Sequence, residues 1–495
     1  MSDNKAIDVA WSDSQYTDFV KKRGNRVARN AVAAMGVNKA AVDPTRMRTY
    51  HDTYSVSRKR TGQVTNQRQS GRCWMFSAFN VLRASTMETL DVDSFEFSQA
   101  YGMFYDKLEK ANMALERIIA MIDRPFDDRE LSFVLEHGMG DGGFYPFAMN
   151  LVLKWGVVPR DAMPDTASAK ASAQMNVQLQ RLIHRDACEL KRLHEAGKDT
   201  GDLRAAKVGM LRDIWRVLAI CLGEPPRTFD LEVAVGPDAQ VPEKLLIAQE
   251  GAPKKAQTAK KDKDKKGADE KDKPQRILRD CGITPLEFLE RYVRVDPADY
   301  VELVSIPSER YPFGQVYHPL LTDSVMGGRP IHMVNVEPEV LDAAAVASLR
   351  AGVPCEMACD VSKEFPRGDE TFGGVLATDT MDFDSLLGTD LAMSREDMYA
   401  SFESSLTHAM TFQGVELDGE GAPVAWRVEN SWGKDACKDG YLIVSSDWFH
   451  LYGGEVVCRR EFVPADVLAL SEEGTAVDVE PWSGFGCAVG AARRA

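Results

Sequence analysis

An eight-residue run decides the fold and leads into an apolar segment: Gln67-Arg68-Gln69-Ser70-Gly71-Arg72-Cys73-Trp74. From Arg72 to Leu90 apolar side chains recur on nearly every side of a helical projection, which predicts a helix buried almost all round. Cys73 stands at the expected start of that helix, where the helix dipole and unpaired N–H groups favour a thiolate. Because a cysteine on an apolar helix also fits an inert core position, Cys73 alone does not establish chemistry.

A nucleophilic thiolate needs a base, a group that orients the base, and donors for the developing oxyanion. His408, in Thr407-His408-Ala409-Met410, is the candidate base. Asn430 follows an expected strand over 424–429 and is the candidate orienting group. Gln67 lies six residues before Cys73, so a turn could bring its amide beside the sulfur. Taken singly, each also has a structural interpretation: a core or surface histidine for His408 and a turn residue for Asn430.

The remaining pattern predicts an α+β fold. Helices are expected over 98–121, up to Trp155, and over 167–222, whereas strands are expected over 300–306, 331–336, 424–429 and 441–446. We divide the chain into an N-terminal lead-in (1–60) with a short polar helix (14–29), a helical lobe that carries Cys73 (61–165), a helical insertion (166–300), a β-rich lobe that carries His408 and Asn430 (301–480), and a C-terminal arm (481–495).

The insertion contains a lysine-rich loop at about residues 252–275. Between Lys254 and Lys273 nine lysines stand against five acidic residues, with no large apolar side chain. Such a segment cannot bury enough surface to order itself, so we expect a solvated loop. A basic arm that binds nucleic acid or an acidic partner is the alternative.

Composition excludes several classes of protein. The net charge of −15, from 60 basic and 75 acidic residues, disfavours nucleic-acid binding as the main function. No apolar stretch reaches the roughly 18 residues that a membrane span needs, and residues 1–11 lack the apolar run of a secretory signal. The nine scattered cysteines predict free thiols in a reducing cytosol, hence a cytoplasmic location.

No metal or cofactor site is expected. Cys355 and Cys359 have tolerable zinc spacing, but no second pair of ligands lies near them in the sequence. The chain also lacks a phosphate-binding Gly-x-x-x-x-Gly-Lys-Ser/Thr loop, a His-Glu-x-x-His helix and a Gly-x-Ser-x-Gly elbow.

Taken together, Gln-x-x-Ser-Gly-x-Cys-Trp, Thr-His-Ala-Met and Glu-Asn-Ser-Trp-Gly resemble a papain-like cysteine peptidase, and more narrowly its bleomycin hydrolase or aminopeptidase C branch. Ser70 stands where secreted relatives have a disulfide-forming cysteine, as an intracellular branch would. The resemblance covers most of residues 60 to 460 and includes Phe97-Ser98-Gln99-Ala100-Tyr101, Asp106-Lys107-Leu108-Glu109-Lys110-Ala111-Asn112, Trp155-Gly156-Val157-Val158-Pro159 and Gly327-Gly328-Arg329-Pro330.

The resemblance implies a two-lobed fold, a helical lobe facing a β-barrel-like lobe, and a role for each matching residue. Cys73 would be the nucleophile, His408 the base and Asn430 its orienting partner. Gln67, with the backbone N–H of Cys73, would form the oxyanion hole. The same resemblance implies that Trp432, otherwise a core aromatic, shields the histidine, and that Asp141, Gly142 and Gly143, otherwise a turn, bind the substrate backbone.

The resemblance also implies an aminopeptidase that assembles as a homohexamer around an inner chamber. In this branch the chain's own C-terminal arm lies in the cleft, and its carboxylate pairs with the substrate's α-amino group. Here the arm ends in Arg493-Arg494-Ala495, and the two arginines would repel an ammonium group. Three functions therefore stay open: an aminopeptidase, an endopeptidase or other thiol acyl hydrolase on the same scaffold, and a nucleic-acid-binding side role.

Overall fold

The computed structural model describes residues 6–248, 276–367 and 373–491. The lysine-rich run from Lys254 to Lys273 lies outside the described residues, as do Arg493 and Arg494.

In the described part of the chain, eleven strands form one mixed sheet, and the middle of this sheet carries His408. Neighbouring strands are antiparallel except in the pairs β14/β6, β5/β7 and β12/β9. A short strand, β1 (Val56–Ser57), pairs with β10 beside this path. The order is β14 (Val477–Val479), β6 (Gln315–Pro319), β7 (Met333–Asn335), β5 (Tyr300–Val304), β13 (Gly453–Arg459), β8 (Cys355–Cys359), β10 (His408–Leu417), β11 (Pro423–Glu429), β12 (Tyr441–Ser445) and β9 (Val375–Leu376).

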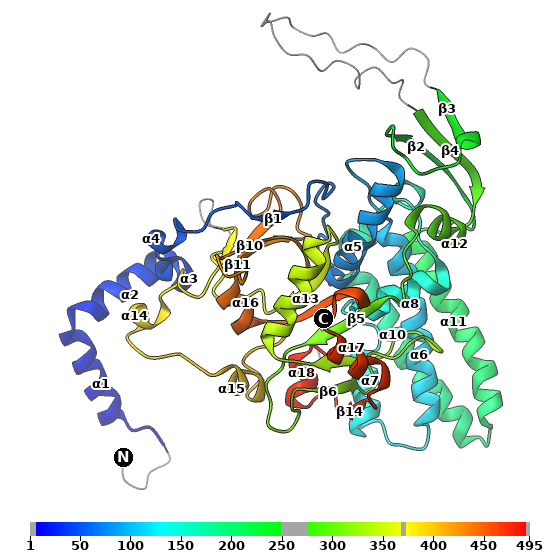
Figure 1. Cartoon of the computed structure of the whole chain (residues 1–495). Coiled ribbons are helices and arrows are strands. Elements are labelled where there is room, and N and C mark those ends of the chain that lie inside the picture. Colours follow the sequence, from blue (N-terminus) through cyan, green and yellow to red (C-terminus); the bar gives the residue numbers. More distant parts are fainter. Residues whose placement is uncertain (1–5, 249–275, 368–372, 492–495) are drawn as a thin grey trace, which may run out of the picture.

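Helices pack on one face of the sheet around α5 (Cys73–Leu90), which is buried along its length except at Ser85 and Glu88. Helix α5 contacts β10 on the sheet side and α8 on the other, and α6, α10 and α11 stand side by side beyond it (Figure 1). These helices are α6 (Gln99–Ala120), α7 (Arg129–His137), α8 (Tyr145–Trp155), α9 (Ala167–Lys170), α10 (Ala173–Glu195) and α11 (Thr200–Leu222), with a 3-10 turn, η1 (Arg160–Ala162).

The other face of the sheet has a second apolar core. Successive residues of the central strands alternate between the two cores: Ala358 and Val457 face α5, whereas Met357 and Val456 face away. The helices from residue 338 onward are α13 (Pro338–Arg350), α14 (Phe383–Leu387), α15 (Arg395–Ala400), α16 (Ser446–Tyr452), α17 (Ala465–Glu473), the 3-10 turn η4 (Arg460–Phe462) and the terminal α18 (Gly484–Ala488). Of these, α18 packs into the core on the α5 side through Phe485 and Ala488.

The helices expected between residues 72 and 155 and the strands expected between residues 300 and 446 are confirmed to within a few residues. Helix α5 ends at Asp91, which adopts a left-handed conformation, and Ser98 caps α6 by accepting from the N–H of Tyr101. Helix α8 ends at Gly156, whose φ of +73° is one that side chains rarely adopt. Local capping chemistry therefore accounts for these boundaries.

The helices expected over 167–222 are confirmed, but the description of residues 166–300 as a helical insertion is wrong in its second half. A three-stranded sheet follows Leu222, in the order β2 (Phe229–Val235), β4 (Arg276–Ile283), β3 (Leu246–Ala248). In β2 buried Phe229 and Leu231 alternate with exposed Asp230 and Glu232, the period of two that marks a strand. Further short elements here are the 3-10 turn η2 (Glu243–Leu245), α12 (Pro285–Phe288) and the π-helical turn η3 (Leu289–Val293).

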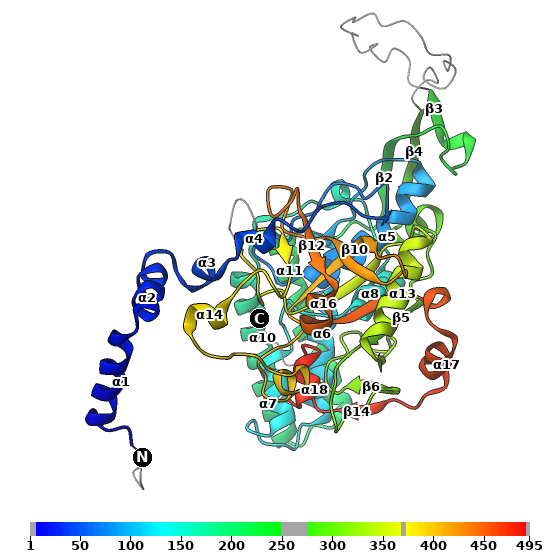
Figure 2. The same ribbon diagram turned by 60° about the vertical axis from the view of Figure 1, so that its left-hand side comes forward.

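The lead-in is more helical than the sequence pattern predicted. It forms α1 (Val9–Lys21), α2 (Arg23–Met35), α3 (Val37–Ala41) and α4 (Pro44–Met47), and α1 and α2 extend away from the body (Figure 2). Neither of these two helices has a buried residue. Among the helices of the described residues, none combines the length and the apolar character needed to cross a membrane.

Buried polar contacts tie α5 to the sheet. The Ser77 hydroxyl donates to the carbonyl of Met410 at 2.6 Å. Farther along the helix, the Arg83 guanidinium donates to the Glu429 carboxylate, and both side chains are almost fully buried. Removing one partner of such a pair leaves an uncompensated buried charge, which costs far more than the pair itself contributes.

We expect Glu429→Gln to lower the free energy of unfolding by about 3–5 kcal/mol, because Arg83 is left buried without its carboxylate. Urea unfolding followed by circular dichroism measures this loss. As a control, Glu96→Gln breaks the more exposed pair with Arg160 and should cost at most about 1 kcal/mol. Equal losses in the two variants would contradict the assignment.

Candidate active site

Cys73 is the first residue of α5 and is 5% exposed. The segment before it is held by the far end of the chain. The N–H of Gln67 donates to the carbonyl of Ser431 at 2.8 Å, and the Ser431 hydroxyl donates to Gln67 Oε1 at 2.5 Å. The side-chain amide of Gln67 donates to the carbonyl of Ser70 at 2.6 Å, which closes the turn before the helix. Residues 364 positions apart are thus in direct contact.

His408 and Asn430 meet because their strands are neighbours. His408 begins β10, Asn430 follows the last residue of β11, and the two strands pair antiparallel. His408 Nε2 lies 2.9 Å from Asn430 Oδ1, and both residues are buried. The centroid of the Trp432 ring lies 5.0 Å from that of the His408 imidazole. The Phe365 ring stacks on Trp432 at a centroid distance of 6.0 Å. The histidine ring is therefore held by one polar and one aromatic contact.

One cleft of about 600 Å³ brings most of the expected site residues together. A cavity of this volume is in the range that binds small ligands and short peptides. Asn430 and Trp432 do not line the cleft and instead contact His408. The expected residues that line it are Gln67, Cys73, Asp141, Gly142, Gly143 and His408.

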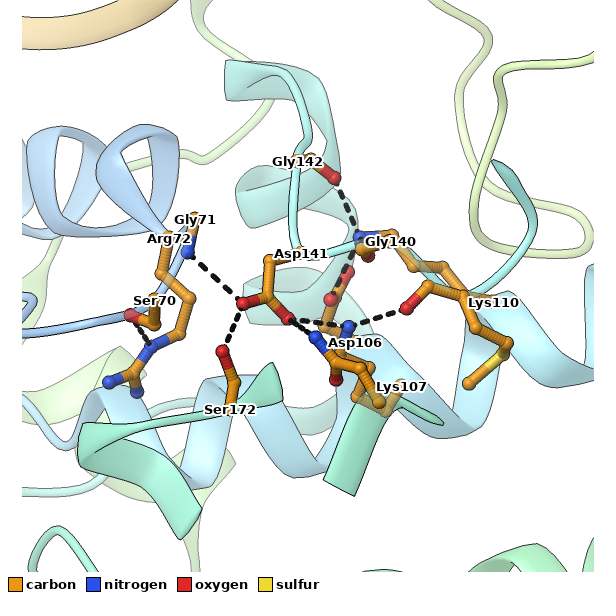
Figure 3. A network of polar contacts seen from close by, with 12 residues as sticks. Ser70, Gly71, Arg72, Asp106, Lys107, Lys110, Gly140, Asp141, Gly142 and Ser172 are labelled. Atoms are coloured by element: carbon orange, nitrogen blue, oxygen red, sulfur yellow. Dashed lines mark hydrogen bonds and ion pairs between the residues drawn. The ribbon is translucent and has the colours of Figure 1, made fainter. Parts of the chain in front are cut away.

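The carboxylate of Asp141 is engaged inside the protein (Figure 3). It accepts from the N–H of Gly71 at 3.0 Å and from the Ser172 hydroxyl, and it pairs with Lys107 at 2.7 Å. Its backbone carbonyl accepts from the Trp74 indole N–H at 2.8 Å. Asp141 thus contacts the residues on both sides of Cys73 and helps to position it. The sequence motifs did not predict this positioning role.

A second buried pair holds the backbone that follows. Lys110 pairs with Asp106 at 2.9 Å and donates to the carbonyls of Gly142 and Gly140 at 2.7 and 3.0 Å (Figure 3). Burial lowers the pKa of Lys110, and the negative charge of Asp106 opposes that shift. Asp106 and Lys110 are four residues apart on α6, so their spacing in the sequence could have predicted the ion pair between them.

The two glycines of this segment differ in their surroundings. A Cβ at Gly143 would come within 2.6 Å of the Trp74 ring, so packing alone requires glycine there. A Cβ at Gly142 would meet no atom within 4 Å, and Gly142 itself lines the cleft. Of the pair, Gly142 therefore leaves its backbone open to an approaching chain.

The C-terminal arm reaches the cleft. The N–H of Leu406 donates to the carbonyl of Ala488 at 2.7 Å, which anchors the end of α18 two residues before His408. Trp482 packs against Phe133 and lies under the guanidinium of Arg129. Gly490 and Ala491 then line the cleft that holds Cys73.

Two buried carboxyl groups beside Cys73 escaped the sequence analysis. Glu356 on β8 and Glu455 on β13 line a second, small cavity that also contacts Cys73. Each is a lone carboxylate in an otherwise apolar strand, in Cys355-Glu356-Met357 and Gly454-Glu455-Val456. That pattern is the signal that could have identified them.

No group of three or more His, Cys, Asp or Glu side chains is arranged to hold a metal ion among the residues that the structure describes. Cys355 and Cys359 lie at opposite ends of β8 and are both buried. Their side chains contribute to the apolar core on the far face of the sheet.

Comparison with known proteins identifies the family of the chain. The model of the Peptidase C1-like family matches residues 6–240 and 264–486. The chain belongs to the Peptidase C1-like family. Its members are cysteine-type peptidases, so the thiol, imidazole and amide described above lie in a peptidase scaffold.

Relatives in this family match over nearly their whole length. Aminopeptidase W of Lactobacillus delbrueckii subsp. lactis is 34% identical, over 95% of this chain and 97% of the relative. Aminopeptidase G of the same organism is 35% identical, over 92% and 94%. A crystal structure of PepW from Lactobacillus rhamnosis HN001 superposes with a TM-score of 0.85 at 29% identity, covering 97% of this chain and 98% of that one.

We expect Asp141→Asn to cost about 3–5 kcal/mol of stability at neutral pH, because Lys107 loses its buried partner. Burial alone would raise the pKa of Asp141, but the Lys107 ammonium and the hydrogen bonds from Ser172 and Gly71 outweigh it and hold that pKa far below its usual range. The stabilisation is thus complete above the unfolded pKa of about 3.9 and is lost as the pH falls below it.

Urea unfolding of wild type and Asp141→Asn between pH 7 and pH 3 measures this dependence. The difference between the two proteins should be largest at pH 7 and should shrink below about pH 4. Ser172→Ala, which removes a neutral donor from the same carboxylate, should cost only about 1 kcal/mol. A difference that stays constant down to pH 3 would refute the assignment.

Proposed function

We propose that this protein is a cysteine aminopeptidase that removes single residues from the N-termini of peptides. The observation that carries the proposal is that Cys73, His408 and the end of the chain's own C-terminal arm line the same cleft. Sequence relatives named aminopeptidases W and G support it.

In the proposed reaction the Cys73 thiolate attacks the carbonyl carbon of the first peptide bond. The resulting tetrahedral intermediate collapses, the C–N bond breaks, and the leaving amine takes its proton from the imidazolium of His408. A water molecule then attacks the thioester and gives its proton to His408. The thiolate leaves, and the free amino acid is released.

The neighbours of this pair have distinct proposed roles. Asn430 engages Nε2 of His408, so Nδ1 is the ring nitrogen that exchanges its proton with Cys73. Trp432 covers the imidazole and keeps water from the bond to Asn430. Gln67 uses one amide hydrogen on Ser70, and its second hydrogen, with the N–H of Cys73, would hold the oxyanion.

We further propose a papain-like division into two lobes. Residues 61–165 would form the lobe that carries Cys73, and residues 301–480 the β-rich lobe that carries His408 and Asn430. The cleft walls support this division, because they combine residues of α6, α7 and the 140–144 segment with Leu321, Thr407 and His408. In this arrangement the N–H of Gly142 would pair with the substrate, because the carbonyl of Gly142 already accepts from Lys110, and Asp141 would hold the segment in place.

Restriction to N-termini is proposed to come from the arm. Gly490 and Ala491 occupy part of the cleft beside Cys73, so a substrate that extended further in that direction would collide with them. An endopeptidase on the same scaffold is the alternative, and it would need that part of the cleft to be open.

The proposal includes a homohexamer. Helices α1 and α2 extend from the body and have no buried residue, and they expose a series of large apolar side chains. Exposed apolar surface of this extent is typical of an interface between copies. The exposed side chains of the two helices are Val9, Trp11, Tyr16, Phe19, Val27 and Met35, and Ile7 is exposed just before α1.

We expect Cys73→Ser to lower the hydrolysis rate of an alanyl anilide by at least about a thousandfold, because a neutral hydroxyl replaces the attacking thiolate. The matched control is Cys188→Ser, which changes an exposed thiol on α10 and should leave the rate unchanged. Iodoacetamide should inactivate wild type and the control equally. Full activity of Cys73→Ser would end the proposal.

Ending the chain after Ala488 removes the part of the arm that lines the cleft. We expect this truncation to raise the cleavage of N-acetylated and internal peptide bonds at least about tenfold relative to alanyl anilide. Both substrates are assayed on one preparation, so the ratio does not depend on the folded fraction. An unchanged ratio would mean that the arm does not restrict the cleft.

A further inference from the structure

Arg117 on α6 places a cation on the wall of the cleft that holds Cys73. Its guanidinium donates from Nη2 to the backbone carbonyl of Asp323 at 2.7 Å, and among the described residues no carboxylate forms an ion pair with it. Nε and Nη1 of Arg117 have no partner there and are not among the fully buried polar atoms, so they reach the solvent of the cleft. Because a guanidinium carries five donor hydrogens, most of its donors are available to a ligand.

This cation is half-buried beside a carboxylate that is engaged elsewhere. Burial lowers the pKa of Arg117 to about 10, and the charge of Asp323 opposes that shift, so the guanidinium stays protonated at neutral pH. The Asp323 carboxylate accepts from the N–H of Ile331 at 3.1 Å, and its other oxygen lies 3.0 Å from Nε2 of His318. A half-buried charge is stabilised most by an opposite charge that reaches its open side, so Arg117 is complementary to an anion.

The lysine and the other aspartate that line the cleft are already paired. Lys110 pairs with Asp106 at 2.9 Å, and Asp141 pairs with Lys107 at 2.7 Å. Among the described acidic, lysine and arginine side chains of this wall, the charge without an ionic partner is therefore that of Arg117. Its positive charge attracts an acidic group of a substrate and repels a basic one.

Arg117 lies within reach of a residue bound at Cys73. Lys110, Met113 and Arg117 follow one another at spacings of three and four on α6, and all three line the cleft. Lys110 donates to the carbonyl of Gly142 at 2.7 Å, so this row begins at the segment that shares the cleft with Cys73. Arg117 lies about 10 Å farther along the helix axis. An extended glutamate side chain of the substrate and the extended arginine side chain together cover that distance.

The side chain of the first residue is the part of a peptide that this space can receive. Under the proposed function Gly490 and Ala491 exclude any residue that precedes the first one, and the leaving amine lies beside His408. The space between the arm and α6 is then left to the side chain of the first residue. A carboxylate on that side chain would meet the open side of the Arg117 guanidinium.

We propose that Arg117 binds the side-chain carboxylate of an acidic first residue, so that the enzyme favours peptides that begin with glutamate or aspartate. The inference rests on the proposed aminopeptidase function and names its substrate class. An arginine that only joined α6 to the 321–324 segment would affect stability, but it would not affect the choice between an acidic and a neutral residue of similar size.

The test compares α-glutamyl 4-nitroanilide with glutaminyl 4-nitroanilide, which is similar in size but has a neutral side chain. We expect the ratio of their kcat/KM values to exceed one in wild type and to fall about tenfold or more in Arg117→Met, because the charged donors of the guanidinium are lost. The loss should fall on the glutamyl substrate. Both rates come from one preparation, so partial unfolding cannot change the ratio.

Arg212→Met is the matched control. Arg212 is an exposed arginine on α11 that lines a separate surface groove with Trp215 and does not line the cleft, so the ratio should not change. Alanyl-alanine and its C-terminal amide test the other carboxylate that a peptide offers. Their relative rates should be the same in wild type and Arg117→Met, because the leaving residue lies on the side of His408.

The results that would overturn the inference are distinguishable. A wild type that cleaves alanine 4-nitroanilide but has the same glutamyl-to-glutaminyl ratio as Arg117→Met overturns the inference alone. A change in the alanyl-alanine comparison in place of the glutamyl one would assign Arg117 to the leaving peptide, and it would overturn the inference as well. A wild type that cleaves none of these substrates overturns the proposed function, and the inference with it.

Discussion

The Ser77 hydroxyl, which donates to the carbonyl of Met410, is the contact on which the rest of the site depends. Ser77 lies one helical turn after Cys73, and Met410 lies two residues after His408. Together with the Thr411 hydroxyl, which lies 3.1 Å from the Ser77 hydroxyl, this bond fixes the start of α5 against the start of β10. The Arg83–Glu429 pair fixes the same helix one and a half turns farther on, against the strand that precedes Asn430. Helix and sheet therefore cannot slide without breaking buried polar contacts, which is costly.

Buried charge organises the surroundings of Cys73 in two different ways. On one side, Asp141 with Lys107 and Asp106 with Lys110 form neutral pairs that hold backbone groups in place. On the other side, Glu356 and Glu302 have no such partner among the described residues. The first arrangement favours a rigid wall. In the second, burial and the charge of Glu455 raise the pKa of both carboxyl groups well above the ordinary value, which favours their neutral forms.

Much of this could be read from the sequence. The apolar run after Cys73, the cap at Ser98 and the alternating strands carried strong local signals. Of the residues that the motifs selected, Gln67 and His408 line one cleft, and Asn430 contacts His408. The sheet of β2, β3 and β4 was missed because β3 has only three residues and a long charged run separates it from β4. Contacts such as Asp141 with Gly71, or Glu356 beside Cys73, depend on how distant segments pack, and no local period encodes that.

The tie between Gln67 and Ser431 has a consequence for the chain while it is being made. Translation runs from the N-terminus, so the nucleophile leaves the ribosome more than three hundred residues before the strand that carries His408. Until then the turn at Gln67 lacks its partner, and the sulfur has no base. A nascent chain is therefore inert toward itself and toward its neighbours on the polysome, and hydrolytic competence arises only at the last stage of synthesis.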